Sequence, residues 1–234
     1  QPPCTEAVLA SGVKRVIVGC TDPNPVVAGR GIRLLREKGL EVVAGVLRGE
    51  CERQNEVFFH FMRTKLPFTV LKYAMTLDGK TATVSGKSQW ITGEAARKRV
   101  HEDRGRYMAI LTGVSTVLAD NPQLTCRIPG GKNPIRVIAD TKLRTPLSST
   151  VVQSARETPT WIVTAVSDTG RKKAYEDAGC RVLSVPAKEG ELDLQAMMQR
   201  LGEEKVDSVM VESGGTLAWS FLKAGLVNRV QAYI

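Results

Sequence analysis

Short runs of aliphatic and β-branched residues alternate along this chain with longer, charged segments of helical character. In the first quarter, the strand-like runs 13–20 and 40–47 enclose a helical segment over 30–39 that ends at Gly39. A β-branched run bounded by turn residues is typical of a strand, and a terminal glycine is typical of a helix end. This order of strand, helix and strand predicts an α/β layer.

The same alternation restarts after a helical segment over 50–66, which ends before Pro67. We therefore expect a boundary between residues 62 and 67, with two domains over 1–62 and 67–234. Strand-like runs follow the boundary at 68–75, 107–113, 134–140, 160–166, 181–185, 207–212 and 229–234. Helical segments separate several of them, at 93–106, 170–179, 192–205 and from about Thr216. This alternation predicts a second α/β domain.

Composition narrows the class of protein. The 234 residues, of which 42% are hydrophobic, are enough to bury a substantial core. No apolar run approaches the length of a membrane span, and the first residues lack the pattern of a secretion signal. The cysteines are odd in number and form no CxxC pair; they are Cys4, Cys20, Cys51, Cys126 and Cys180. This argues against a disulfide framework, so we expect a cytoplasmic protein with no membrane partner.

The formal net charge of +9 predicts an anionic partner. A surface that binds nucleic acid typically has clustered Lys and Arg with aromatic residues between them. Here the basic residues are dispersed and only 5% of all residues are aromatic. A phosphorylated small molecule fits this composition at least as well, and a basic nucleic-acid-binding protein remains an alternative.

A glycine turn after a buried run gives the sharpest chemical signal. The run ends at Glu212, Gly214 and Gly215 follow, and a helix begins at about Thr216. Glycines let the backbone approach a ligand closely, and the free N–H groups of a helix start bind anions. The pattern predicts an anion-binding turn, although an ordinary strand-to-helix turn can have the same sequence pattern. Neither GxGxxG nor GxxxxGKS occurs, so a standard Rossmann fingerprint or P-loop is not supported.

Two further polar stretches follow strand ends. The first carries Lys72 on its strand and then presents Ser88 and Trp90 from a polar loop. The second follows the run at 107–113 and is expected to be a polar loop, with Thr116, Asp120 and Arg127. A hairpin turn, a half-buried anchor and a solvated capping loop would explain the same residues.

The two histidines give no support to nucleophilic catalysis. His60 and His101 lie far apart in charged, helical segments, and solvated helix faces explain both. No arrangement of Ser, His and Asp or of Cys and His is readable.

Six stretches, taken in order, resemble one known family. They are PPCTEAV, DPNPVVAGRGI, MRTKLPFTVLKYAMTLDGKTA, GKSQWIT, ILTGVSTVLADNPQLTCR and VESGGTLAWSFL. Together they look like the bifunctional riboflavin biosynthesis proteins, in which a diaminohydroxyphosphoribosylaminopyrimidine deaminase is fused to a 5-amino-6-(5-phosphoribosylamino)uracil reductase. The resemblance covers essentially the whole chain and implies a form truncated at both ends, which associates with further copies of itself.

The resemblance implies a partial cytidine-deaminase-like α/β layer over 1–62. It is followed over 67–234 by a dihydrofolate-reductase-like α/β domain with a mostly parallel sheet that lacks its last strands. The family's deaminase, a hydrolase, binds zinc through two Cys and the His of a His-x-Glu motif. Cys4 matches the second Cys, and the other ligands and the Glu have no match in this sequence. This half is therefore expected not to deaminate.

The reductase half is implied to be an NADPH-dependent oxidoreductase, which converts the ribosyl group of the deaminated phosphoribosylaminopyrimidine to a ribityl chain. The residues that match NADPH-binding positions are Ala74, Trp90, Thr116, Asp120, Thr141, Gly214, Gly215 and Thr216. Those that match substrate-binding positions are Ser88, Arg104, Leu124, Arg127 and Glu212, with the two arginines on the phosphate. Lys72 and Glu212 are the expected catalytic pair.

A stand-alone dihydrofolate-reductase-type enzyme acting on a pteridine is the enzymatic alternative. The stretch PPCTEAV and the α/β unit that it opens argue against this alternative, because a folate enzyme has no reason to carry them.

Overall fold

The computed structural model describes residues 4–24, 26–86, 88 and 90–234. They form two compact units, Gln1–Lys65 and Leu66–Ile234. Each unit contains a parallel sheet of its own.

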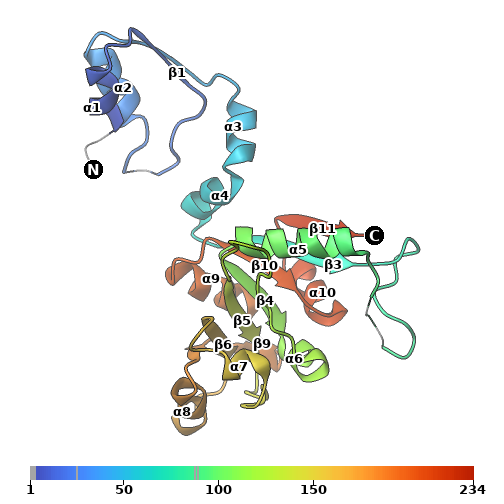
Figure 1. Ribbon diagram of the computed structural model, residues 1–234. Coiled ribbons are helices and arrows are strands. Elements are labelled where there is room, and N and C mark those ends of the chain that lie inside the picture. The colour runs from blue at the N-terminus through green and yellow to red at the C-terminus, as the bar shows by residue number, and fades with distance from the viewer. Residues whose placement is uncertain (1–3, 25, 87, 89) are drawn as a thin grey trace. The chain divides into compact units, whose positions relative to one another are not determined.

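The first unit is a small α/β layer (Figure 1). Its elements are α1 (Cys4–Ala10), β1 (Arg15–Val18), α2 (Arg30–Glu37), β2 (Glu41–Ala44), α3 (Arg48–Gln54) and α4 (Glu56–Thr64). β1 and β2 pair in parallel. The expected strand 40–47 ends early, because Gly45 and Leu47 have φ angles of 89° and 52°, which an extended strand does not contain. The expected helix 50–66 is divided in two at Asn55.

The second unit is built on a seven-stranded sheet in the order β11-β3-β10-β4-β5-β6-β7. All six neighbouring pairs are parallel. The strands are β3 (Phe68–Ala74), β4 (Ala109–Gly113), β5 (Ile135–Ala139), β6 (Thr160–Thr164), β7 (Arg181–Ser184), β10 (Ser208–Glu212) and β11 (Arg229–Tyr233). The expected mostly parallel α/β sheet is confirmed.

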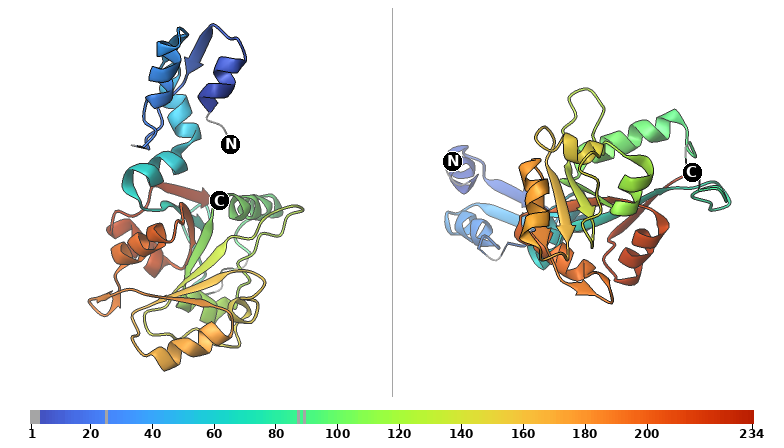
Figure 2. Two further views of the ribbon diagram at one scale, coloured as in Figure 1. Left: turned by 90° about the vertical axis from the view of Figure 1, so that its left-hand side faces the viewer. Right: turned by 90° about the horizontal axis from the view of Figure 1, so that it is seen from below.

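Helices cover both faces of this sheet (Figures 1 and 2). Because parallel crossovers are right-handed, the connections that run from β3 toward β7 lie on one face, and those that return lie on the other. The first face carries α5 (Glu94–Arg106), α6 (Val114–Asp120), α7 (Thr150–Gln153) and α8 (Thr169–Asp177). The second face carries α9 (Leu194–Glu203) and α10 (Gly215–Lys223).

Alternation along the strands explains the two cores. The face toward α9 and α10 buries Leu71, Leu111, Val137, Val163 and Val211 against Met197, Met198, Leu201 and Phe221. Their strand neighbours, which point to the α5 face, are fully buried as well: Val70, Ile110, Ile138, Ile162 and Met210. Strands that are buried on both faces are continuously apolar, which is the pattern that the sequence shows.

Four elements of the second unit were not expected. α6 replaces the expected polar loop after β4, α7 lies in a stretch with no expected element, and β8 (Ala187–Lys188) and β9 (Glu191–Leu192) form a short antiparallel hairpin. α6 is rich in Val, Ser and Thr, which have weak helix propensity, and tertiary burial of Val114 and Val117 stabilises it. Thr116 and Asp120 therefore lie on a helix and not in a loop.

Among the described residues, no helix is both long enough and apolar enough to cross a bilayer.

Candidate active site

Two charged side chains meet at the carboxyl ends of β3 and β10. Lys72 on β3 pairs in register with Glu212, the last residue of β10. Parallel pairing places both side chains on the α5 face, where Lys72 Nζ lies 3.5 Å from Glu212 Oε2. Both are largely buried, with side chains 16% and 12% exposed. The sequence-predicted catalytic pair is therefore in contact.

Helix α5 supplies a second cation to the same carboxylate. Arg104 donates from Nε to Glu212 Oε1 at 2.8 Å and from Nη2 to Oε2 at 3.0 Å. Its Nη1 donates to the carbonyl of Thr125 at 3.1 Å. Two parallel bonds of this kind fix the plane of a carboxylate. The guanidinium of Arg104 is thus occupied within the protein.

These cations hold Glu212 in its charged form. Burial raises the pKa of the Glu212 carboxyl, but its bonds to Arg104 and the charges of Arg104 and Lys72 outweigh burial and lower the pKa below its ordinary value. Glu212 is therefore ionised at neutral pH.

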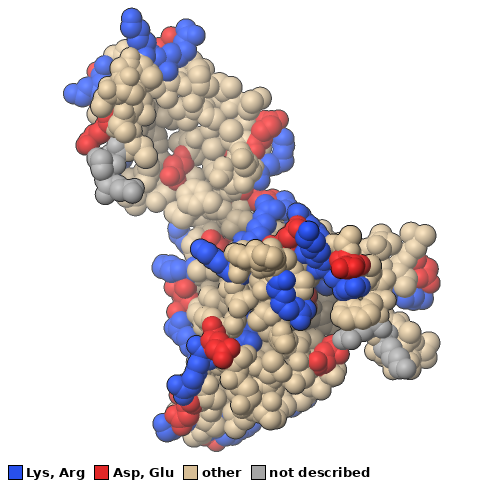
Figure 3. Space-filling view, viewed as in Figure 1, with Lys and Arg blue, Asp and Glu red and all other residues tan. Residues whose placement is uncertain are grey.

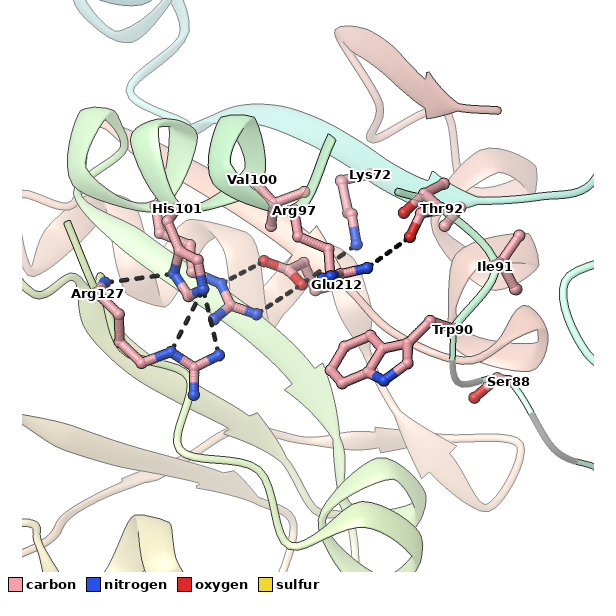
Figure 4. A pocket seen from close by; sticks show the side chains of 12 residues that line it. Lys72, Ser88, Trp90, Ile91, Thr92, Arg97, Val100, His101, Arg127 and Glu212 are labelled. Atoms are coloured by element: carbon pink, nitrogen blue, oxygen red, sulfur yellow. Dashed lines mark hydrogen bonds and ion pairs between the residues drawn. The ribbon is translucent and has the colours of Figure 1, made fainter. Parts of the chain in front are cut away.

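The Lys72–Glu212 pair lies in a cavity of about 180 Å³ (Figure 4). The cavity is lined by residues of β3, β10 and α5 and of the segments before α5 and after α6. Seven sequence-predicted site residues line it: Lys72, Ala74, Ser88, Trp90, Arg104, Arg127 and Glu212. These residues are separated by up to 140 positions in sequence, from 72 to 212, and the parallel sheet brings them together.

His101 also lines this cavity, so its interpretation as a solvated helix residue was wrong. Its Nδ1 lies 3.3 Å from the backbone nitrogen of Arg127, and its Nε2 lies 3.3 Å from Arg127 Nε (Figure 4). A neutral imidazole has one acceptor nitrogen, so it accepts one of these bonds at a time. His101 lies one helical turn before Arg104, and this spacing was the available signal.

Lowering the pH is expected to destabilise the fold through His101. Burial, followed by the charges of Arg104 and Arg127, lowers the pKa of this imidazole below its ordinary value. Between the lowered and the ordinary value the unfolded chain binds more protons than the folded one, so stability rises with pH through that window and is lost as the pH falls below about 6.5. Urea unfolding at pH 7.5 and 5.5 should show a smaller pH effect in His101→Gln than in the wild type. If the free energy of unfolding changed equally with pH in both proteins, the assignment of this pH dependence to His101 would be wrong.

A second cavity, of about 670 Å³, adjoins the first and shares Trp90, Arg97, His101 and Arg127 with it. The guanidinium of Arg97 stacks 4.7 Å from the ring centroid of Trp90, and its Nη1 donates to the carbonyl of Thr92 at 2.8 Å (Figure 4). Lys98 adds a further cation to the lining. Arg97, Lys98 and Arg127 outnumber the carboxylate of Glu94 in this lining, so the space suits an anionic group. The sequence reasoning missed Arg97 and Lys98.

The other sequence-predicted residues do not line the first cavity. Thr116 and Asp120 lie on α6 after β4, Thr141 follows β5, and Gly214, Gly215 and Thr216 begin α10 after β10. All of them follow carboxyl ends of parallel strands, so they continue the sheet edge at which Lys72 and Glu212 lie. Leu124 is buried, with 4% exposure and a φ of 54°.

The start of α10 can accept an anionic cofactor group. Gly214 and Gly215 are exposed, and a Cβ added to either would meet no atom within 4 Å, so a ligand can reach the backbone. No side chain caps the helix, which leaves its first N–H groups free of a capping bond. The residues present therefore fit a phosphate of a dinucleotide.

The first unit does not fit a zinc ion. Cys4 is exposed at the start of α1. Within the described part of the chain, no three His, Cys, Asp or Glu side chains are grouped closely enough to hold a metal. One thiolate is too few for a zinc site, which takes three or four protein ligands.

Comparisons with known proteins agree on one family. The family model described as the RibD C-terminal domain matches residues 67–234. The riboflavin biosynthesis protein RibD of Actinobacillus pleuropneumoniae is 48% identical over 233 residues, which are 100% of this chain and 62% of the relative. That of Bacillus amyloliquefaciens is 45% identical over 99% of this chain and 62% of the relative. The chain thus spans less than two thirds of the length of these relatives.

Solved structures give the same result. A deaminase/5-amino-6-(5-phosphoribosylamino)uracil reductase from Thermotoga maritima superposes with a TM-score of 0.82 at 37% identity, over 99% of this chain and 62% of that one. RibD from Acinetobacter baumannii superposes with a TM-score of 0.84 at 34% identity, over 99% of this chain and 64% of that one.

Proposed function

This chain belongs to the family of RibD C-terminal domains, and from that premise we propose that its second unit is an NADPH-dependent oxidoreductase of riboflavin biosynthesis. Its substrate is the deaminated 5-amino-6-(5-phosphoribosylamino)uracil, and its product carries a ribityl chain in place of the ribosyl group. The observation that carries this proposal is the buried group of Lys72, Arg104 and Glu212 at the carboxyl ends of β3 and β10. A paired acid and base beside an anion-binding helix start suits the reduction of a phosphorylated sugar.

The carboxyl edge of the sheet carries the residues that would bind the cofactor. Gly214, Gly215 and Thr216 would hold a phosphate at the start of α10, and Thr116, Asp120 and Thr141 lie after the neighbouring strands. Ala74 and Trp90 line the cavity beside Lys72 and would contact the reactive end. When bound, NADPH supplies the hydride that the ribosyl carbon accepts.

Residues of this chain supply the proton that opening of the ribose ring requires. Opening the ribose ring breaks the bond between the ring oxygen and the carbon attached to nitrogen, and the bonding electrons stay on the oxygen. Lys72 Nζ donates a proton to that oxygen, while the amino nitrogen forms a double bond to the carbon. This carbon would then accept the hydride that bound NADPH supplies, and the double-bond electrons would return to nitrogen. Glu212 holds the Lys72 side chain in place through their 3.5 Å ion pair, and Arg104 orients Glu212.

The substrate phosphate is assigned to Arg127 and the adjoining cavity with Arg97 and Lys98. Arg104 was expected to share this role, but its bonds to Glu212 and Thr125 leave it better suited to orienting the carboxylate. Ser88 lines the first cavity, with Lys72 and Glu212, and would contact the sugar. Leu124, which precedes the segment that carries Arg127, would contribute through its backbone and packing.

The first unit is proposed to be part of a deaminase domain, as its similarity to the relatives over 99–100% of this chain supports. Since its residues do not fit zinc, we assign no deamination step to them. Association of the protein with itself and a cytoplasmic location remain predictions.

The direct test is NADPH oxidation by this chain, followed at the absorbance maximum of the reduced nicotinamide. We expect turnover with the deaminated ribosylamino substrate and none with its amino precursor, since the residues that the structure describes offer no zinc site for the preceding step. Turnover with a pteridine, and not with the ribosylamino compound, would instead support a dihydrofolate-type reductase. Binding of an oligonucleotide that weakens steeply with salt, without NADPH binding, would support a nucleic-acid-binding protein. On the face drawn in Figure 3, Lys and Arg are interspersed with Asp and Glu and form no continuous basic stripe.

A further inference from the structure

Three polar side chains form a row across three adjacent strands. Gln231 on β11 pairs in register with Lys72 on β3, which pairs in register with Glu212 on β10. Residues paired in parallel strands point to the same face, so the row lies on the face that α5 covers. Lys72 is the middle member.

Helix α5 contacts both ends of this row through consecutive residues. Arg104 binds Glu212 at one end, as described above. At the other end, Asp103 Oδ2 accepts bonds of 2.6 Å from Gln231 Nε2 and of 2.6 Å from Tyr233 Oη. Gln231 Nε2 also donates to Tyr233 Oη at 2.8 Å, so the three side chains form a closed triangle.

The triangle is connected to Lys72 by the ring of Tyr233. Lys72 Nζ lies 5.8 Å from the centroid of that ring, within the range of a cation–π contact. Tyr233 pairs with Ala74, two residues beyond Lys72 on the same face of β3. The ammonium therefore has the Glu212 carboxylate on β10 on one side and the Tyr233 ring on β11 on the other.

We propose that Asp103 is a positioning residue, which acts through Tyr233 and Gln231 to hold the ammonium of Lys72 beside Glu212. This inference rests on the reductase function proposed above. Asp103 is only 2% exposed, and the ion pair that the described residues give it is a distant one, with Arg99 Nε 3.7 Å from its Oδ1. Burying a carboxylate costs desolvation free energy. An apolar side chain would attach the helix to the sheet without that cost. The value of the carboxylate lies in directing the phenol and the amide beside Lys72.

The kinetic arm of the test compares Asp103→Asn, Tyr233→Phe and the double variant. We expect each single change to lower kcat about tenfold to a hundredfold, because a small displacement of a proton donor is costly, and to change KM by less than about threefold. The double variant should be no slower than the slower single variant, because both changes break the same bond.

Two controls separate positioning from general stability. Val230→Ala lies on the same strand with an exposed side chain, and Phe221→Leu removes buried volume from the opposite face of the sheet. We expect both to retain the wild-type kcat, and Phe221→Leu should lose at least as much thermal stability as Asp103→Asn. A drop in kcat that follows the loss of stability in all variants would overturn the proposal, as would independent, multiplicative effects of Asp103→Asn and Tyr233→Phe.

A second arm does not depend on activity. In protein labelled with ¹³C-lysine, the Lys72 Cε–Hε signal, identified by its loss in Lys72→Met, should carry a ring-current shift that disappears in Tyr233→Leu. We expect Asp103→Asn to move this signal toward that of exposed lysines and Val230→Ala to leave it in place. An unmoved signal in Asp103→Asn overturns the proposal. If the wild type oxidised no NADPH, the reductase function would fail, and this arm alone would decide the position of Lys72.

Discussion

Lys72→Met is expected to lower kcat for NADPH-dependent reduction by at least about a hundredfold, the usual contribution of a positioned proton donor. Methionine has nearly the length of lysine but carries no proton to donate. The fold should persist, because Glu212 keeps both of its bonds to Arg104. Single-turnover NADPH oxidation at saturating substrate measures the effect on the chemical step.

Lys72→Arg separates the two roles of this residue. An arginine keeps the positive charge beside Glu212, but its guanidinium does not give up a proton at neutral pH. We expect Lys72→Arg to be nearly as slow as Lys72→Met if proton donation is the role of Lys72. Lys173→Met, at an exposed position on α8, is the matched control and should keep the wild-type rate. Unchanged turnover in Lys72→Met would remove Lys72 from the mechanism.

Arg104→Met is expected to lower both the stability of the fold and the rate. It leaves the buried Glu212 carboxylate without its bidentate partner, and the loss of one member of a buried ion pair costs about 3 kcal/mol of unfolding free energy. The remaining contact to Lys72, at 3.5 Å, is weaker. Urea unfolding at pH 7 measures the loss of stability. Arg106→Met, an exposed arginine on the same helix, should change stability little.

The pH dependence of Arg104→Met gives a more specific result. In the wild type the pKa of Glu212 is lowered, so its ionisation stabilises the fold above the ordinary carboxyl pKa, and this contribution is lost as the pH falls through the lowered value. Without Arg104, burial dominates and should raise the pKa of Glu212. The variant should then be more stable near pH 5 than near pH 7, relative to the wild type. A stability difference that does not vary with pH would show that Arg104 is not the group that keeps Glu212 charged.

The sequence pattern was sufficient where local interactions decide structure. The seven strands of the large sheet in the second unit were predicted close to their observed bounds, because strands buried on both faces are continuously apolar and bounded by polar turns. The turn after Glu212 was predicted from its glycines alone. α6 was missed, since Val, Ser and Thr favour helix only weakly, and the burial that stabilises it comes from distant residues.

Which charged side chains meet depends on the three-dimensional fold. Arg104 and Glu212 are 108 positions apart, and Asp103 and Tyr233 are 130 apart, so no local spacing connects them. In the sequence, His101 is one more polar residue on a charged helix. The fold places it in the lining of the same cavity as Glu212 of β10 and Arg127. The strands, the glycine turn and the set of candidate residues could be predicted from the sequence, because they depend on neighbours along the chain. The partners of each charge depend on strand order and register, which place residues far apart in sequence at one edge of one sheet.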